Sequence, residues 1–421
     1  MNSVNKIITQ LENGQHEEAL IGYEQILTFG SNEERFLLAE EFFQYGFIKE
    51  SQNLIQRLLE IYPEEGELLV LLAETFIELG NEEQAILILE KIHVEDSSFP
   101  ESLLLLADLY QMEGLYEVSE QKLLKAKRLL PNEIVIDFAL GETYAEQGKF
   151  SDAIRCYEKV LETEEEIAGV NVNQRMADSI SSGGAFEDAL PYYEKALSTK
   201  LELNTLFNYA FTALQAGFNN KAIEKFLELK EIDPEYYSLY IHLARAYERE
   251  EEPEKGYFAL KEGLNYDEFN KDLFFYAGKL ALKIGNEDEA EKMLREALAL
   301  DPELTEAALT LNKLLIHQER YEDVIEIIKL MEDGEEVEPR FLWDSAVAYQ
   351  NLEEYSEALN RYESAYTFYK DTTEFLIDYG YFLMEEGKQI EAVEIFTKLL
   401  KMDPSNEEFL DVWQRLTDDR E

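Results

Sequence analysis

Six basic side chains recur at fixed spacing in the C-terminal half of this acidic chain. Arg245, Lys279 and Lys313 lie 34 residues apart, and another basic residue follows each of them four residues later. These followers are Arg249, Lys283 and His317. Guanidinium and ammonium groups in such an array would bind carboxylates through charge-assisted hydrogen bonds. The pattern is unexpected here, because 38 Lys and Arg stand against 90 Asp and Glu, for a formal net charge of −52.

A second interpretation of these cations stays open. Nearby acids such as Glu248 and Glu306 could neutralise them in a solvated ion-pair network that binds nothing. Like charges one helical turn apart repel each other, however, and adjacent helices add to that repulsion. A site for a carboxylate-rich partner segment explains why the chain keeps such an arrangement, and we favour it.

Catalytic and metal-binding chemistry has little support in the sequence. The four histidines lie in different regions, with no Cys or His partner at metal-ligand spacing. The single cysteine, Cys156, lies between Arg155 and Tyr157 on a helix-patterned segment and is expected to be a packed thiol. No glycine-rich phosphate loop is present. We therefore predict no enzyme activity, no catalytic residues, no metal site and no cofactor.

Charge and composition exclude several classes of protein. The net charge of −52 repels nucleic acid and anionic lipid over a Debye length of roughly 10 Å. Apolar runs such as residues 68–73 are far shorter than the roughly 20 residues that cross a bilayer. Residues 1–6 lack the apolar stretch of a secretory signal. We expect a cytoplasmic protein that binds neither nucleic acid nor membrane and is a monomer or a weak homodimer.

The elements that position the basic residues follow from a period that runs along the whole chain. Small residues that open amphipathic segments recur from Ala19 to Ala392, most often 34 residues apart. Within one unit, such as residues 134–161, two apolar helical stripes flank a turn. Glycine recurs at that turn, as at Gly148, and proline recurs after the second stripe, as at Pro131. Each unit is therefore predicted to be a helical hairpin that buries its apolar face by stacking on its neighbours.

This pattern resembles the tetratricopeptide repeat (TPR) family, in the form found in bacterial cytoplasmic proteins. The resemblance covers nearly the whole chain and implies an all-α fold, a right-handed superhelical solenoid of about twelve helix–turn–helix hairpins. Repeats 8 and 10 depart from the family pattern and should pack less regularly. Their departures are Glu251, Gly256, Asn312 and Val324. The residues that carry the resemblance in repeat 5 are Gly141, Tyr144, Gly148, Phe150, Ala153 and Tyr157.

The predicted solenoid is continuous but has irregular places. Residues 1–167 are expected to hold repeats 1–5 and residues 168–404 to hold repeats 6–12, followed by a capping helix in residues 405–421. A joint is expected near 162–172, where the spacing stretches to 36 residues across an acidic run that lengthens a loop or helix end. A second acidic loop, residues 332–339, separates repeats 10 and 11.

The resemblance implies that the first helix of each repeat lines a concave groove, and this defines two patches. The first patch joins the six basic residues to flanking aromatic side chains, which would supply buried area, although they also suit contacts between neighbouring helices. These aromatic residues are Phe207, Phe211, Phe275 and Trp343. The second patch is an acidic row that would attract a basic segment, although it also suits a solvated face. Its members are Glu40, Glu74, Asp108 and Glu142.

These features together predict a protein-interaction scaffold or adaptor that holds a segment of a partner protein in the groove. The apolar row would supply affinity, and the basic residues of repeats 8–10 would fix the register against carboxylates. Two other functions stay open. One is a peptide-sensing regulator whose groove closes on a small ligand, and the other is a module that assembles with itself through exposed end or convex surfaces.

Overall fold

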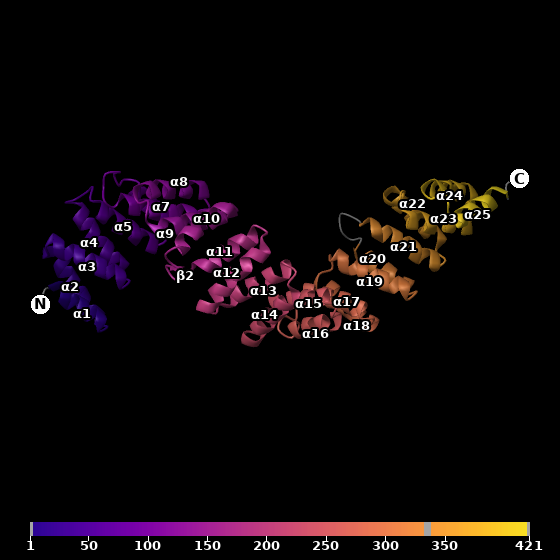
Figure 1. The fold of residues 1–421 in the computed structure, drawn as a ribbon, viewed down its shortest axis with the longest axis horizontal. Helices are drawn as coiled ribbons and strands as arrows, with labels where there is room; N and C mark the ends of the chain where they lie inside the picture. Colours follow the sequence, from indigo (N-terminus) through magenta and orange to yellow (C-terminus); the bar gives the residue numbers. More distant parts are fainter. Residues whose placement is uncertain (1–2, 332–337, 419–421) are drawn as a thin grey trace. The chain divides into compact units, whose positions relative to one another are not determined.

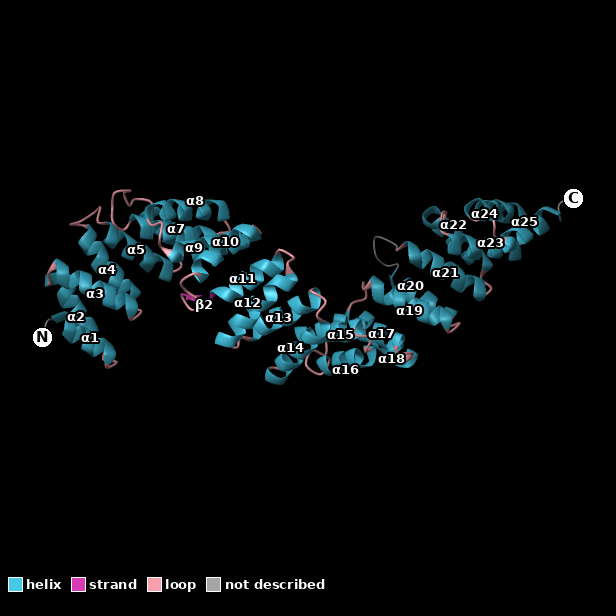
Figure 2. Cartoon of the chain, in the orientation of Figure 1, coloured by secondary structure: helices cyan, strands magenta, loops and turns pink. Residues whose placement is uncertain are grey.

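The structure is a computed structural model that describes residues 3–331 and 338–418 (Figure 1). Within these residues the chain forms twenty-five α-helices and one two-stranded sheet (Figure 2). Residues 332–337 of the predicted acidic loop lie outside the described part. The chain forms two compact units, unit 1 (Met1–Thr212) and unit 2 (Ala213–Glu421). Consecutive helices pack as antiparallel hairpins, so the predicted all-α hairpin solenoid is confirmed.

Unit 1 contains repeats 1–6 and most of α13 (Leu203–Gln215), the helix in which the two units divide. Its other helices are α1 (Ser3–Glu12), α2 (His16–Phe29), α3 (Asn32–Gln44), α4 (Ile48–Leu59), α5 (Gly66–Glu78), α6 (Glu82–Leu89), α7 (Phe99–Met112), α8 (Tyr116–Leu129), α9 (Ile134–Glu146), α10 (Phe150–Leu161), α11 (Val172–Ser182) and α12 (Phe186–Thr199).

The core of unit 1 lies within each hairpin and between successive hairpins, where small residues let helices approach closely. Gly141 on α9 shows why. A Cβ atom at this position would lie 2.5 Å from a ring carbon of Tyr157, which is fully buried on α10. The aromatic side chain therefore fills the space that the glycine leaves, which explains why the two residue types recur together.

The predicted joint near 162–172 is a short β-hairpin. Strands β1 (Glu166–Ile167) and β2 (Val170–Asn171) pair antiparallel, with Ile167 opposite Val170. The turn residues Ala168 and Gly169 have φ angles of 48° and 81°, and two positive φ angles in sequence suit a two-residue hairpin turn. The extra length is therefore taken up by strand pairing and not by a longer loop or helix end. The predicted boundary at 167/168 falls in this turn, while the compact units divide further along the chain, inside α13.

Unit 2 contains the rest of repeat 7, repeats 8–12 and the predicted capping helix, which is confirmed as α25 and buries Phe409, Val412 and Leu416. Its helices are α14 (Asn219–Ile232), α15 (Ser238–Arg249), α16 (Pro253–Gly263), α17 (Lys271–Lys283), α18 (Glu287–Leu300), α19 (Thr305–His317), α20 (Tyr321–Met331), α21 (Pro339–Asn351), α22 (Tyr355–Tyr369), α23 (Thr373–Glu385), α24 (Gln389–Met402) and α25 (Glu407–Asp418).

The turn inside each hairpin requires a left-handed backbone. Glycine supplies it at most turns, as at Gly148 with a φ angle of 71°. Glutamate occupies the same position in repeats 8, 10 and 11, where Glu251, Glu319 and Glu353 have φ angles of 61°, 58° and 62°. The left-handed conformation costs a non-glycine residue roughly 1–2 kcal/mol. Repeats 8 and 10 thus keep the hairpin geometry without the turn glycine.

Repeats 8 and 10 differ in how their unusual residues fit. A Cβ atom at Gly256 would lie 3.0 Å from the carbonyl oxygen of Ala244, so α15 and α16 approach closely there. Asn312 on α19 is completely buried, and neither its amide nitrogen nor its amide oxygen has a hydrogen-bond partner among the described residues. Burying an amide without hydrogen-bond partners lowers the stability of the fold, and the small residue usual at this position would avoid that loss.

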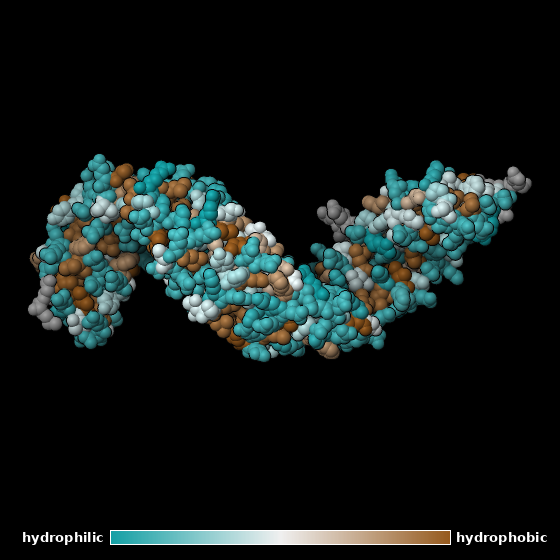
Figure 3. All heavy atoms as spheres, in the orientation of Figure 1, coloured by the Kyte–Doolittle hydropathy of each residue, from teal (hydrophilic) through white to brown (hydrophobic). Residues whose placement is uncertain are grey.

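Hydrophilic residues cover much of the face that Figure 3 shows, as the charge of the chain requires. Over the part of the chain that the structure describes, none of the helices combines the length and apolar character needed to span a membrane.

Candidate functional site

A groove of about 600 Å³ lies on unit 2, between the first helices of repeats 8, 9 and 10. Helices α15 and α17 are in contact, so residues 34 positions apart come side by side. The groove brings together four of the residues predicted from the sequence, Arg245, Arg249, Phe275 and Lys279. Its other lining residues are Ile241, Glu248, Asp272, Tyr276, Leu304 and Glu306.

Two cations of this groove lie near the ring of Tyr276. The guanidinium carbon of Arg245 lies 5.8 Å from the centroid of the Tyr276 ring, and the ammonium nitrogen of Lys279 lies 6.0 Å from it. Lys279 also lies 5.3 Å from the centroid of the Phe275 ring. These distances are within reach of cation–π attraction, which holds both exposed cations against an aromatic surface. We did not predict Tyr276, and the adjacent aromatic pair at 275–276 was the available signal.

Glu248 balances part of this positive charge. The Tyr276 hydroxyl donates a hydrogen bond to the Glu248 carboxylate, and the Lys283 ammonium nitrogen lies 2.9 Å from its other oxygen. Burial raises the pKa of Glu248, but Tyr276, Lys283 and Lys279 outweigh burial and leave that pKa below its usual value. Burial and Glu248 together raise the pKa of Tyr276. Lys283 is therefore paired with an acid, as the ion-pair interpretation expects.

The other predicted basic residues have different surroundings. Arg249 donates a hydrogen bond of 2.6 Å to the carbonyl oxygen of Leu214 in the last turn of α13, so it stabilises a helix end as well as lining the groove. Lys313 is exposed on α19, outside the groove lining. His317 is also exposed, with its Nδ1 atom 4.0 Å from the Glu287 carboxylate. The structure therefore gathers Arg245, Arg249 and Lys279 and leaves the repeat 10 pair apart from them.

Trp343 is not a surface aromatic residue. It is 6% exposed and packs against the rings of Tyr369 and Phe375. Its indole nitrogen donates a 2.9 Å hydrogen bond to Asp378, and the Arg340 guanidinium lies over its ring. Our expectation that it flanks the basic residues in a groove needs correction, because this side chain forms part of the core between repeats 11 and 12.

Phe207 and Phe211 belong to unit 1. They lie on α13 with their ring centroids 6.3 Å apart and nearly parallel, and both are half-buried. Of the four predicted aromatic residues, Phe275 alone lines the groove of unit 2.

The groove has acidic lining residues in the same number as its cations. Besides Glu248, Asp272 lies in the first turn of α17 and Glu306 in the first turn of α19. Acids in these positions are stabilised by the adjacent helix N-termini. Arg245 and Lys279 are held over aromatic rings instead, which keeps them exposed at the groove surface. In a chain of charge −52, the lining of this groove is therefore locally balanced in charge.

The predicted acidic row lies in unit 1 and varies in its surroundings. Burial raises the pKa of Glu40 and of Glu74, and neighbouring glutamates raise both further. Burial also raises the pKa of Glu142. Two partners act in the opposite direction and lower it by less: the Tyr157 hydroxyl, which donates a hydrogen bond to the carboxylate, and Arg175, whose Nε lies 3.2 Å from it. Asp108 is exposed. Burial therefore disfavours the charged form of three acids in this row. Glu142 in addition already has partners within the protein.

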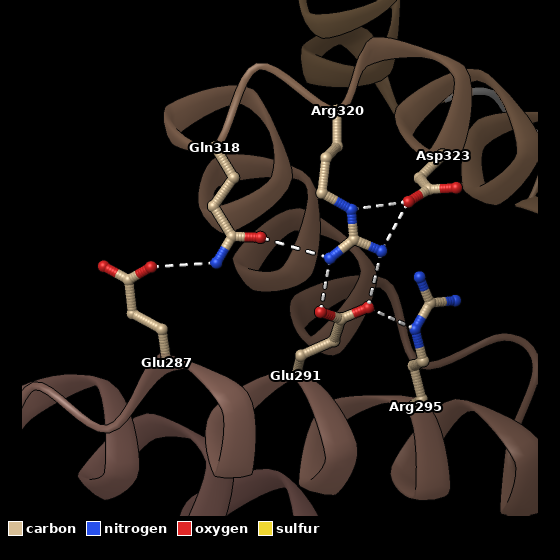
Figure 4. Close-up of polar contacts among 6 residues, drawn as sticks. All are labelled: Glu287, Glu291, Arg295, Gln318, Arg320 and Asp323. Carbon is tan, nitrogen blue, oxygen red and sulfur yellow. Dashed lines mark hydrogen bonds and ion pairs between the residues drawn. The ribbon is translucent and has the colours of Figure 1, made fainter.

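A separate polar cluster joins repeats 9 and 10 (Figure 4). The two terminal nitrogens of Arg320 lie 2.6 and 3.0 Å from the oxygens of Glu291, and its Nε lies 2.7 Å from Asp323. Arg295 contacts the same Glu291 carboxylate at 2.8 Å. Arg320 holds the pKa of Glu291 below its usual value despite partial burial. This cluster fastens α20 to α18, and its bidentate geometry fits a structural role.

Cys156 has the surroundings of an inert thiol. It is buried, and burial raises its pKa to about 11, so the nucleophilic thiolate is scarce at neutral pH. Among the residues that the structure describes, no three His, Cys, Asp or Glu side chains meet in a possible metal site.

The hairpins stack on each other, have small residues where their helices cross and a left-handed residue in each turn, and end in a capping helix. These features define a tetratricopeptide repeat protein. Three regions match known families of that class. Residues 111–165 match YpiA-like tetratricopeptide repeats, residues 339–406 match YpiA-like C-terminal tetratricopeptide repeats, and residues 273–304 match the general tetratricopeptide repeat.

The chain is 44% identical over 416 residues to the TPR repeat-containing protein YpiA of Bacillus subtilis strain 168, covering 99% of this chain and 98% of that protein. The chain therefore belongs to the YpiA-like family of TPR proteins.

Solved structures resemble the chain at lower similarity. YrrB, described as a TPR protein with an unusual peptide-binding site, has a TM-score of 0.40 and 18% identity, covering 44% of this chain and 96% of that chain. The Cut9–Hcn1 hetero-tetramer of the APC/C has a TM-score of 0.38 and 13% identity, covering 97% of this chain and 94% of that chain.

Proposed function

We propose that this protein is an interaction scaffold that binds a carboxylate-bearing segment of a partner protein in the groove of α15, α17 and α19. The observation that carries the proposal is the placement of Arg245 and Lys279 over the Tyr276 ring. Membership of a repeat family supports a binding role over catalysis. A cytoplasmic location stays a prediction from the sequence.

The chemistry of the groove supports a segment with both apolar and acidic side chains. Ile241, Phe275 and Leu304 offer apolar area, which supplies most of the affinity in a peptide groove. Arg245 and Lys279 are exposed and lie near the Tyr276 ring, so a partner carboxylate on their solvent side would form charge-assisted hydrogen bonds. The cations would fix the register of the segment.

The net charge of the chain restricts the partner further. At long range a charge of −52 repels acidic proteins, and the groove acts only at contact distance. A suitable partner is therefore neutral or basic as a whole and presents one locally acidic segment.

Partner capture with a charge-reversed chain tests this proposal. The double variant Arg245→Glu, Lys279→Glu is compared with the wild type for the proteins it retains from a cytoplasmic extract, quantified by mass spectrometry. The matched control is Lys329→Glu, Lys401→Glu, which makes the same change in net charge at two exposed sites on α20 and α24.

We expect proteins that the wild type and the control retain, and that the groove variant loses. Circular dichroism and thermal melting should match in all three chains, because the four substituted residues are exposed. Equal retention by the groove variant and the wild type would overturn the proposal. The acidic row of unit 1 stays a separate prediction of a site for a basic segment.

A further inference from the structure

The first hairpin of unit 1 has an uncommon apolar surface. Phe29, at the end of α2, is 87% exposed, and Ile21, about two turns earlier on the same helix, is 63% exposed. Both line a hollow of about 440 Å³ between α1 and α2. Exposed apolar side chains beside a hollow are typical of protein interfaces. Hydrophobic surface is also visible over α2 and α3 on the face that Figure 3 shows.

The floor of this hollow is also apolar. Ile7 of α1 and Ile26 of α2 are buried there and line it. Gly22 lies between the two helices, where a Cβ atom would come within 2.6 Å of Ile7. The missing side chain lets α1 pack closely against α2 beneath the hollow.

We propose that the occupant of this hollow is α2 of a second copy of the chain, in a two-fold symmetric dimer. An interface of this kind needs complementary features next to each other on one surface, because each copy presents the same patch. Phe29 and Ile21 are protruding side chains, and the hollow lies directly beside them. Two copies related by a two-fold axis would each insert these side chains into the hollow of the other.

The charged rim favours the same occupant. Lys6 on α1 and Glu18 on α2 are both exposed and both line the hollow, on opposite helices. When α2 of one copy lies against α1 of the other, Lys6 of each copy faces Glu18 of its partner. Two opposite-charge pairs then form at the rim, and they offset locally a small part of the repulsion between two chains of charge −52.

The opposite end of the repeat array shows that this chain covers a terminal hairpin with an amphipathic helix. There, α25 buries Phe409, Val412 and Leu416 against the last repeat. In the dimer, α2 of the second copy would provide the equivalent cover for repeat 1. This inference concerns a surface of unit 1 and goes beyond the proposed groove of unit 2.

Sedimentation equilibrium of the full chain tests the dimer. The wild type should show a concentration-dependent mass that approaches twice 49.0 kDa. Phe29→Glu should raise the dissociation constant about tenfold or more, since it places a charge in the interface core. Phe269→Glu is the control, because that phenylalanine is 73% exposed on unit 2. Circular dichroism of the variants should match the wild type, because both residues are exposed.

A charge swap tests the two-fold geometry itself. Lys6→Glu and Glu18→Lys should each weaken self-association, because each creates like-charge pairs. An equimolar mixture of these two variants should dimerise again, because every rim contact between unlike chains is then an opposite-charge pair. The proposal is wrong if the wild type keeps a mass of 49.0 kDa at all concentrations, if Phe29→Glu dimerises as the wild type does, or if the mixture does not recover. Arg245→Glu, Lys279→Glu should stay dimeric, which separates this result from the fate of the groove.

Discussion

Arg245 and Lys279, which are 34 residues apart in the sequence, lie over one aromatic ring, that of Tyr276. The repeat period converts their separation along the chain into adjacency on neighbouring helices. At these distances cation–π attraction holds both exposed cations near the same ring. This relationship leads to a prediction about the Tyr276 ring.

Replacing the Tyr276 ring should weaken partner binding more than removing its hydroxyl. Tyr276→Ala deletes the surface under both cations and should reduce affinity roughly 2- to 5-fold, the range of an exposed cation–π contact. Tyr276→Phe keeps the ring and loses only the hydrogen bond to Glu248, so its affinity should stay near that of the wild type. Isothermal titration calorimetry with the partner that the wild type retains measures both. Equal losses in the two variants would show that the hydroxyl matters and the ring surface does not.

Replacing the three turn glutamates that have a left-handed backbone by glycine should stabilise the protein. Glu251→Gly, Glu319→Gly and Glu353→Gly each relieve a positive φ angle and should add about 1 kcal/mol to the free energy of unfolding. The reverse change, Gly285→Ala, should cost about the same, because a Cβ atom there meets no neighbour within 4 Å and the effect is one of backbone strain alone. Urea denaturation followed by circular dichroism gives the values. Stabilities that do not change in either direction would contradict the assignment of strain.

The contact between Arg320 and Glu291 should be a structural link between repeats 9 and 10. Arg320→Ala leaves the partly buried Glu291 carboxylate without its bidentate partner and should lower the free energy of unfolding by about 1–3 kcal/mol. In the double variant with Glu291→Ala, the combined loss should be smaller than the sum of the single losses. Additive losses would mean that the two side chains do not act together.

The same contact has a predictable pH dependence. Arg320 lowers the pKa of Glu291 in the folded chain, so the contact contributes stability above the unfolded pKa of glutamate and loses it as the pH falls through the lowered value. The stability difference between the wild type and Arg320→Ala should therefore shrink in acid.

Glu74 should show the opposite pH dependence. Burial is the main cause that raises the pKa of Glu74, and the charges of Glu101 and Glu78 raise it further. The folded chain therefore holds the proton more tightly than the unfolded chain. Stability then falls as the pH rises from the unfolded pKa through the raised value, and the full cost is present at neutral pH. Glu74→Gln should have a higher melting temperature than the wild type at pH 7, with a difference that disappears in acid. Exposed Asp108→Asn is the control, and it should change the melting temperature much less.

Asn312→Ala should stabilise repeat 10. The amide is fully buried with no hydrogen-bond partner among the described residues, and alanine at this position restores the small residue of the repeat pattern. Relief of an unsatisfied amide is worth about 1–3 kcal/mol, and the smaller side chain leaves a void that offsets part of it. A net gain of about 1 kcal/mol by urea denaturation is expected. A loss of stability would indicate that the amide is satisfied, for instance by a buried water molecule.

The hairpin array could be predicted from the sequence because its signals are local and repeated. Gly148 ends a helix through its own backbone freedom, and Phe409, Val412 and Leu416 form one face of a capping helix through their spacing alone. Such features depend on residues within one or two helical turns. Repetition then allows each signal to be checked against its copies in other units.

The candidate site was predictable only in part, because side-chain partners come from other helices. Arg249 is drawn to the end of α13 by the Leu214 carbonyl, Lys283 is paired with Glu248, and Trp343 is buried among aromatic rings. A row of equivalent positions contains none of this information, because it records residue types and not the neighbours that each side chain meets.

The sequence by itself determined the hairpins, their number, their turns and the positions at which basic residues recur. A fixed period and the local conformational preferences of glycine, proline and amphipathic segments are sufficient to predict all four features. Only the tertiary structure decided that Arg245 and Lys279 are gathered by Tyr276 into one groove, while Lys313 and His317 lie apart from it. The physical reason is that cation–π contacts, ion pairs and burial act between atoms a few ångströms apart in space, and these distances are set by how the helices pack.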